Sequence, residues 1–229
     1  MIISGFDKLT LTNYPGVVAA TIFTNGCNFK CPYCQNGSLA LGVDQNRVNE
    51  DEILDYLEKR KKMIDGLCIS GGEPTIQKDL KEFIIKVKKI GTKVKLDTNG
   101  TNPELIKDLI DNDLLDYIAM DIKMPFSKYD DISGVKVKID RLKESIKIIN
   151  NSKVEHEFRT TIIKEFHTMK DIEEIISYIG KSNYYIQNFI DSENVLMANL
   201  HGFTDNELLE INKELNEKYT NCHVRGLKI

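Results

Sequence analysis

Three cysteines in one short run have the clearest chemical potential in this sequence. They form the pattern Cys27-x-x-x-Cys31-x-x-Cys34 and directly follow an apolar, β-like run over residues 17–23. At this spacing one loop can direct three thiolates toward a single metal centre. A closed tetrahedral structural site has four protein ligands, so a centre with three protein ligands keeps one position free for chemistry.

Two kinds of metal centre are compatible with these cysteines. A [4Fe–4S] cube held by three cysteines leaves one iron free to bind a small ligand. Alternatively, a zinc ion takes its fourth ligand from elsewhere, the candidates being His156, His167, His201, His223, Cys68 and Cys222. Zinc sites usually pair one C-x-x-C with a second pair. Because this sequence has no second pair, we favour the cluster.

Three polar runs follow strand-like segments further along the chain. They are SGGEP at 70–74, DTNG at 97–100 and DIK at 121–123. In parallel α/β sheets the carboxyl ends of the strands meet at one rim, where ligands bind. We therefore expect the cysteine loop and these runs to converge on one site.

The residue types in these runs indicate ligand contacts. Gly71 and Gly72 allow close approach of the backbone to a ligand, and Glu73 can accept a hydrogen bond from an ammonium group. Asp97 and Asp121 could share a cation or contact ligand hydroxyls. The alternative for the first run is an ordinary glycine-rich turn before a helix.

Two basic residues belong to the same expected rim. Lys123 lies two residues after Asp121, on the same face of the strand, and could neutralise a ligand carboxylate. Arg159 lies within a strand-like segment and needs an anionic partner if it faces the interior. The alternative for the Asp121 and Lys123 pair is a solvated surface contact. Among the histidines, His167 has the best position to reach the rim.

Strands and helices alternate along the chain. Strands are expected at 17–23, 66–70, 94–97, 116–122, 154–162 and 184–189, and helices at 50–62, 76–90, from Pro103, at 139–150, at 169–179 and from Thr204. This order is typical of a parallel sheet with right-handed crossovers. An open doubly wound sheet and a curved partial barrel both fit it. We expect one domain over residues 1–229, with a core at about 17–190 and a last helix at about 204–219.

Composition limits the class of protein. The chain has 229 residues, 41% of them hydrophobic, which suits a folded α/β domain, and a net charge of −4 argues against a nucleic-acid binder. The N-terminal sequence is not that of a secretory signal, and no run approaches a membrane span, so we expect a cytoplasmic protein. There we expect Cys68 and Cys222 to be buried free thiols rather than half-cystines.

The motifs together resemble one enzyme family. The cysteine pattern, with Tyr33 just before its last cysteine, resembles the motif of radical S-adenosylmethionine (SAM) enzymes, and Gly71-Gly72-Glu73 resembles their GGE motif. The runs DTNG and DIK, with NYPG at 13–16, resemble the small glycyl-radical-enzyme activases. Within that group the similarity is greatest to anaerobic ribonucleoside-triphosphate reductase activating proteins. The resemblance implies a partial (β/α)6 barrel of parallel strands, like an incomplete TIM barrel.

The resemblance also implies a mechanism. Cys27, Cys31 and Cys34 hold a [4Fe–4S] cluster, and SAM binds its open iron through its amine and carboxylate. An electron from reduced flavodoxin or ferredoxin then cleaves SAM to methionine and a 5′-deoxyadenosyl radical. That radical takes a hydrogen atom from a backbone glycine of a partner enzyme, here anaerobic ribonucleotide reductase.

Site roles follow from the same resemblance. Gly71, Gly72 and Glu73 are expected at the methionine amine, and Lys123 at the methionine carboxylate. Asp97 and Arg159 are expected to contact SAM, and Tyr33 to pack near the adenine. Asp97, Thr98 and Asp121 correspond to residues that bind a monovalent cation near SAM.

The sequence departs from the activase pattern in two places. Residues 13–18 lack the arginine found in the corresponding run of pyruvate formate-lyase activases, so docking of the partner's glycine loop could differ. There is also no inserted ferredoxin-like domain, so one cluster is expected. Two alternatives stay open: a radical SAM enzyme acting on a deazapurine, nucleoside or other small molecule, and a zinc-binding interaction module without catalytic activity.

Overall fold

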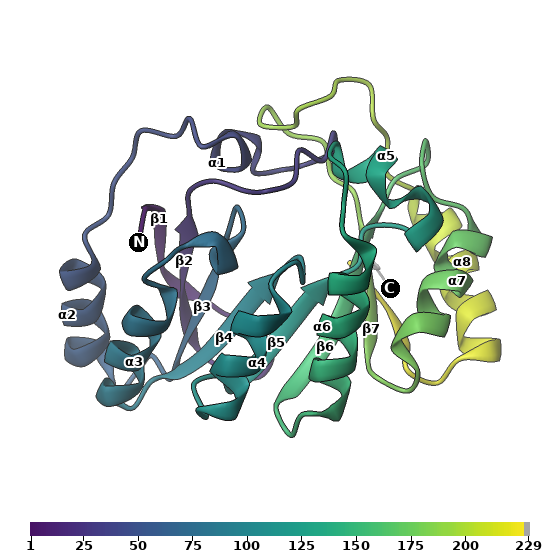
Figure 1. Cartoon of the computed structure of the whole chain (residues 1–229). Helices are drawn as coiled ribbons and strands as arrows, with labels where there is room; N and C mark the ends of the chain where they lie inside the picture. Colours follow the sequence, from purple (N-terminus) through teal and green to yellow (C-terminus); the bar gives the residue numbers. More distant parts are fainter. Residues whose placement is uncertain (227–229) are drawn as a thin grey trace.

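One curved sheet organises the part of the chain that the computed structural model describes, residues 1–226 (Figure 1). Its eight strands are neighbours in sequence order. They are β1 (Ile3–Thr10), β2 (Ala19–Thr24), β3 (Gly66–Gly71), β4 (Lys93–Thr98), β5 (Tyr117–Asp121), β6 (Glu155–Ile162), β7 (Tyr184–Asn188) and β8 (Cys222–Arg225). β1 pairs antiparallel with β2, and every later pair is parallel. Seven strands, β2 to β8, are therefore parallel, and β2 to β7 are the six strands of the expected partial barrel.

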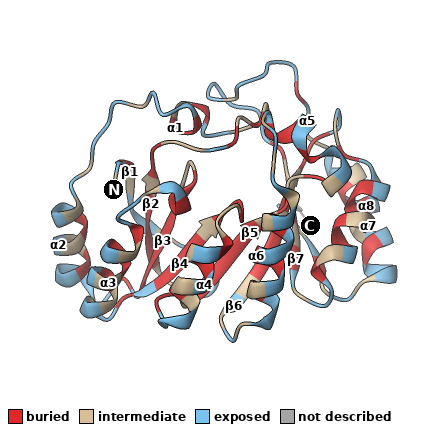
Figure 2. Cartoon of the chain, in the orientation of Figure 1, coloured by how far each residue is buried: buried red, intermediate tan, exposed pale blue. Residues whose placement is uncertain are grey.

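Within residues 1–226, six helices cover the outer face of this sheet (Figure 1). They are α2 (Glu50–Arg60), α3 (Leu80–Ile90), α4 (Pro103–Asp111), α6 (Ile139–Asn151), α7 (Met169–Ile179) and α8 (Asp205–Lys218). Two short helices, α1 (Gly37–Leu41) and α5 (Tyr129–Ser133), lie instead on the loops at the top of the view. Two 3₁₀ turns, Pro74–Ile76 and Phe126–Lys128, follow β3 and β5. The buried residues lie on the sheet and on the helix faces that pack against it (Figure 2).

Local sequence explains where the helices form. In α3 the buried residues Leu80, Phe83, Ile84 and Val87 recur at helical spacing, so one stripe packs on the sheet. α4 begins with Pro103 in its first turn, after Asn102, whose side chain accepts from the Leu105 N–H. These signals place each crossover helix between two parallel strands.

The structure adds elements to those expected from the sequence. β1 and β8 were not predicted. β1 carries its buried residues only at its start, so it lacks the alternation of a half-buried strand. β8 is four residues long. The helix expected at 76–90 begins only at Leu80, because Pro74–Ile76 forms a separate turn.

Two further expectations concern the extent of the domain. The last helix, α8, lies within the range expected for it. The expected domain of residues 1–229 includes 227–229, which lie outside the described residues. No helix in residues 1–226 is both long enough and apolar enough to span a membrane.

Candidate functional site

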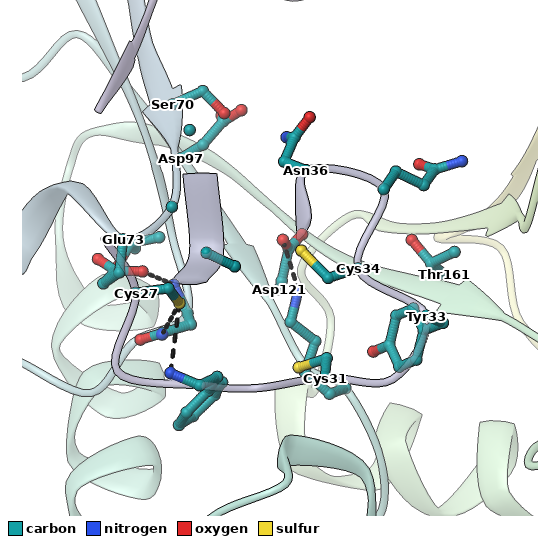
Figure 3. Close-up of a pocket in the computed structure, with 18 of the residues that line it drawn as sticks. Cys27, Cys31, Tyr33, Cys34, Asn36, Ser70, Glu73, Asp97, Asp121 and Thr161 are labelled. Atoms are coloured by element: carbon teal, nitrogen blue, oxygen red, sulfur yellow. Dashed lines mark hydrogen bonds and ion pairs between the residues drawn. The ribbon is translucent and has the colours of Figure 1, made fainter. Parts of the chain in front are cut away.

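A pocket at the carboxyl ends of the parallel strands brings the predicted site residues together (Figure 3). Its lining includes Cys27, Cys31, Tyr33, Cys34, Gly71, Gly72, Glu73, Asp97, Thr98, Asp121, Lys123 and Arg159. They come from the loop after β2 and from the ends of β3, β4, β5 and β6. The convergence expected from strand-end positions is therefore present in the fold.

The three cysteines lie on one loop between β2 and α1 and are free thiols. Their sulfurs lie apart along the pocket wall (Figure 3). The Phe29 N–H donates to Cys27 Sγ at 3.3 Å. Burial raises the pKa of Cys27 to about 12 and that of Cys31 to about 11, because a thiolate is poorly solvated there. A bound metal centre would supply the positive charge that favours the thiolates.

The donor set fits a multi-iron centre better than one ion. Within residues 1–226, no group of three or more His, Cys, Asp or Glu residues is placed to hold a single metal ion. A [4Fe–4S] cube binds each cysteine through a different iron, so its ligands stand apart. The residues considered as a fourth zinc ligand, His156, His167, His201, His223, Cys68 and Cys222, are not among those that line the pocket.

His167 is buried behind the site instead of facing it. Its Nδ1 accepts from the Ile163 N–H at 3.2 Å, and its Nε2 contacts the Lys123 carbonyl oxygen at 2.9 Å. The Tyr129 hydroxyl accepts from the Lys123 N–H at 3.1 Å. His167 and Tyr129 thus hold the backbone of Lys123 from both sides, a role that sequence reasoning missed.

The chain that leads into the cysteine loop packs so closely on residues 71 and 72 that both must be glycine. A Cβ on Gly71, whose φ is +121°, would lie 2.2 Å from Thr24 N, and one on Gly72 would lie 2.0 Å from Gly26 O. Two backbone hydrogen bonds follow from this approach, Gly72 N–H to Thr24 O at 2.8 Å and Glu73 N–H to Gly26 O at 2.9 Å. The glycines therefore let the loop after β3 dock on the chain that leads to Cys27.

Gly72→Ala is expected to separate these two loops and to weaken binding of SAM, the ligand that the sequence resemblance implies. The new Cβ meets a backbone oxygen that cannot rotate away, so we expect a loss of about 1–3 kcal/mol in unfolding free energy, measured by chemical denaturation. Gly91→Ala is the control, because Gly91 has a positive φ but open space around it. It should lose stability with SAM affinity unchanged. Equal SAM affinity in Gly72→Ala and the wild type would contradict this role.

Glu73 joins the loop after β3 to the loop after β4. Its buried carboxylate accepts from Thr75 N–H at 3.0 Å, Thr75 Oγ1 at 2.6 Å, Thr98 Oγ1 at 2.8 Å and Asn99 N–H at 2.7 Å. Burial raises the pKa of Glu73, and these hydrogen bonds oppose the rise. The carboxylate is thus engaged with protein groups on both sides.

Two asparagines connect the cysteine loop to the same unit. Asn99 Nδ2 donates to Asn28 Oδ1 at 2.8 Å, and Asn28 Nδ2 donates to Thr101 Oγ1 at 2.8 Å. Sequence reasoning assigned no role to either. Their positions in the sequence, Asn28 next to Cys27 and Asn99 within the DTNG run, were the features that could have indicated this role. The loops after β2, β3 and β4 therefore form one hydrogen-bonded assembly.

Asp97, Asp121 and Arg159 form an ion-pair network inside the barrel. Arg159 Nε donates to Asp121 Oδ1 at 2.8 Å, and its Nη1 lies 3.5 Å from Asp97 Oδ2. Lys123 Nζ donates to Asp121 Oδ2 at 2.9 Å, and Lys95 pairs with the other oxygen of Asp97. The expected anionic partners of Arg159 are thus these two aspartates.

Electrostatics keep both carboxylates ionised. Burial alone would raise their pKa values, but Arg159 and the neighbouring lysines hold the pKa of Asp97 and that of Asp121 below the usual range. Below them, Glu157 pairs with Arg225 at 2.6 Å. The network described here has four cations, Lys95, Lys123, Arg159 and Arg225, and three carboxylates. Of these cations, Lys123 and Arg159 line the pocket, where an anionic ligand group could meet them.

Tyr33 offers a polar group to a ligand. Its side chain is buried, and its hydroxyl has no hydrogen-bond partner among the described residues. Buried polar groups are rarely left without a partner. An unpartnered hydroxyl, three separate thiols and the Lys123 ammonium group in one pocket together fit a site for an iron–sulfur cluster and a ligand with a carboxylate.

Comparisons with known sequences indicate the family of this chain. The sequence model of the Radical SAM superfamily matches residues 21–179 of this chain. A Methanocaldococcus jannaschii protein, provisionally named a glycyl-radical enzyme activating enzyme, is 36% identical over 99% of this chain and 96% of its own. The 7-carboxy-7-deazaguanine synthase of Methanospirillum hungatei is 32% identical over 80% of this chain and 76% of its own.

Solved structures confirm the fold. SuiB of Streptococcus suis, in a structure with bound S-adenosylmethionine, has a TM-score of 0.71 and 16% identity over 92% of this chain and 52% of its own. The enzyme anSMEcpe with bound AdoMet has a TM-score of 0.63 and 17% identity over 85% of this chain and 58% of its own. The family uses a [4Fe–4S] cluster and SAM, which stands against a zinc-binding module. The match to the family model, the relative that aligns over nearly the whole chain and the barrel fold agree. This chain therefore belongs to the radical SAM superfamily.

Proposed function

We propose that this protein is a glycyl-radical-enzyme activase, which takes a hydrogen atom from a backbone glycine of a partner protein. The observation that carries the proposal is the similarity to the M. jannaschii protein, at 36% identity across nearly the whole of both chains. A second M. jannaschii protein with the same provisional name is 30% identical over 78% of this chain. We further propose anaerobic ribonucleotide reductase as the partner and flavodoxin or ferredoxin as the electron donor.

Cys27, Cys31 and Cys34 would hold the cluster, and the remaining lining residues would bind SAM. When bound, the cluster and SAM supply a one-electron reductive cleavage that yields methionine and a 5′-deoxyadenosyl radical. The protein contributes binding, orientation and exclusion of water. Because the Glu73 carboxylate already accepts four hydrogen bonds, we assign it to loop positioning. The methionine amine is then left to the backbone of Gly71 and Gly72.

Lys123 would neutralise the methionine carboxylate. Its ammonium group lines the pocket and pairs with Asp121, and its backbone is held by His167 and Tyr129. Tyr33, beside the last cysteine, would supply its unpartnered hydroxyl and ring to the nucleoside part of SAM. Asp97 and Arg159 would stand at the methionine side of the same site.

Lys123→Ala is expected to weaken SAM binding at least about tenfold. The substitution removes the proposed charge pair between Lys123 and the methionine carboxylate, and truncating one partner of such a buried pair costs well over ~1.4 kcal/mol of binding free energy. Equilibrium binding of SAM to the reconstituted protein measures this change, with iron content unaltered. Lys128→Ala is the matched control, since Lys128 pairs with Asp171 on the outside of the barrel, at 2.7 Å. A SAM dissociation constant equal to that of the wild type would remove Lys123 from the site.

The activase proposal is tested by electron paramagnetic resonance. Reduced, reconstituted protein is incubated with SAM and purified anaerobic ribonucleotide reductase, and a glycyl radical doublet is expected. A reaction with the Cys31→Ala variant gives the background signal. Formation of 5′-deoxyadenosine without a glycyl radical on this or another glycyl radical enzyme would reject the proposal.

A second candidate is a radical SAM enzyme that acts on a small molecule. It is favoured by the similarity to 7-carboxy-7-deazaguanine synthase and by that to the GTP 3′,8-cyclase of Helicobacter pylori, 27% identical over 82% of this chain. Gln187 and Thr161 also line the pocket and could contact such a substrate. A purine nucleotide or deazapurine precursor that increases 5′-deoxyadenosine formation and is itself converted would establish this function instead.

A further inference from the structure

Three side chains, Asp97, Thr98 and Asp121, correspond to a monovalent-cation site, and the two carboxylates among them are paired with protein cations. The carboxylate oxygens of Asp97 face Lys95 Nζ and, at 3.5 Å, Arg159 Nη1. Those of Asp121 face Arg159 Nε at 2.8 Å and Lys123 Nζ at 2.9 Å. Each of the four oxygens therefore has a positively charged partner.

The third of these side chains also makes its contacts within the protein. The Thr98 hydroxyl donates to Glu73 Oε1 at 2.8 Å and accepts from the Gly100 N–H at 3.1 Å. It is therefore directed to the junction of the loops after β3 and β4. A cation held by oxygen ligands would have to compete for this hydroxyl as well as for the two carboxylates.

Arg159 is fixed between the two aspartates by the strands. It is the register partner of Asp121 in the parallel pair of β5 and β6. Its side chain is 12% exposed, and its Nη1 also lies 4.0 Å from Glu157 Oε1. Because a guanidinium is planar and permanently charged, it can bridge two carboxylates that a small ion would otherwise join.

We propose that the Arg159 guanidinium takes the place of a monovalent cation between Asp97 and Asp121, so that SAM binding by this protein is independent of K⁺ and Na⁺. The proposal is an alternative to the expected cation held by Asp97, Thr98 and Asp121. It rests on the SAM site and does not depend on which substrate receives the radical.

The first test compares salts on the reconstituted wild-type protein. SAM dissociation constants are measured in KCl, NaCl and tetramethylammonium chloride at equal ionic strength, together with melting temperatures without SAM. We expect dissociation constants within about twofold of one another and the same melting temperature in each salt. Binding at least about tenfold tighter in K⁺ or Na⁺ would overturn the proposal. Failure to bind SAM in every salt would instead count against the SAM site itself.

The second test removes the guanidinium. Arg159→Gln leaves the two carboxylates without their shared cation, so K⁺ should now raise the melting temperature and tighten SAM binding relative to tetramethylammonium. Arg159→Lys, which keeps the charge, should respond less to K⁺. Arg141→Gln is the control, because Arg141 pairs with Glu104 on the outside of the barrel. A folded Arg159→Gln variant without a K⁺ response would contradict the proposal, and if that variant does not fold, the wild-type salt series decides.

Discussion

Cys31→Ala is expected to remove iron from the protein and to abolish cleavage of SAM. Cys31 is one of three thiols that line the pocket, and a cube with two cysteine ligands loses both its anchorage and its position beside the SAM site. Iron content, absorbance near ~400 nm and 5′-deoxyadenosine formation under reducing conditions measure these losses. We expect 5′-deoxyadenosine formation to fall to background.

A buried cysteine outside the pocket provides the control for this variant. Cys222 lies in β8 and is also a buried free thiol, but it does not appear in the pocket lining. Cys222→Ala should keep iron, colour and SAM cleavage while losing some stability from the smaller side chain. Unchanged iron content in Cys31→Ala would reject the assignment of the ligands.

Glu73→Ala is expected to have the largest effect among the residues that do not bind the cluster. The buried carboxylate accepts hydrogen bonds from Thr75, Thr98 and Asn99, so its removal leaves two N–H groups and two hydroxyls without their acceptor. We expect a loss of about 3–5 kcal/mol in unfolding free energy. SAM binding should weaken as well, because the loops after β3 and β4 are no longer joined.

Two comparisons make this prediction specific. Glu73→Gln keeps the shape but can turn an NH₂ donor toward the Asn99 or Thr75 N–H, so it should fall between alanine and the wild type. Glu165→Ala removes a carboxylate that contacts His201 at the surface, and its effect should be small. Denaturant unfolding and SAM binding below the melting temperature are the measurements, and iron should remain bound. Wild-type SAM affinity in Glu73→Ala would show that the junction does not organise the site.

The principal elements of the fold could be predicted from the sequence. Strand and helix periodicities are local, and their alternation implies parallel strands whose carboxyl ends lie on one side. That reasoning placed the loops after β2, β3, β4 and β5 at one rim, as found in the pocket. β1 and β8 were missed because one has a broken burial pattern and the other is short.

The chemical assignment of the cysteines was equally local. Three thiols within eight residues can reach one centre whatever the rest of the chain does, so their spacing indicated a metal centre with an open position. Asp121 ends β5 and Lys123 follows two residues later, so strand-like alternation predicted that these side chains share a face, and they form an ion pair. Such inferences need only the geometry of one segment.

The tertiary structure decided which partner each polar group meets. Glu73 accepts from Asn99, and Arg159 lies between Asp97 and Asp121, contacts between residues that are distant in sequence. These contacts depend on strand register, which makes Arg159 of β6 the partner of Asp121 on the adjacent β5, and on the curvature of the sheet, which brings Arg159 to 3.5 Å from Asp97 of the non-adjacent β4. The sequence by itself therefore determined the order of the main strands and helices, their common rim and the clustering of three thiols on one loop. The packed barrel determined that Glu73 joins two loops and that a guanidinium lies between the aspartates, because hydrogen bonds and ion pairs depend on ångström-scale positions that local periodicity does not specify.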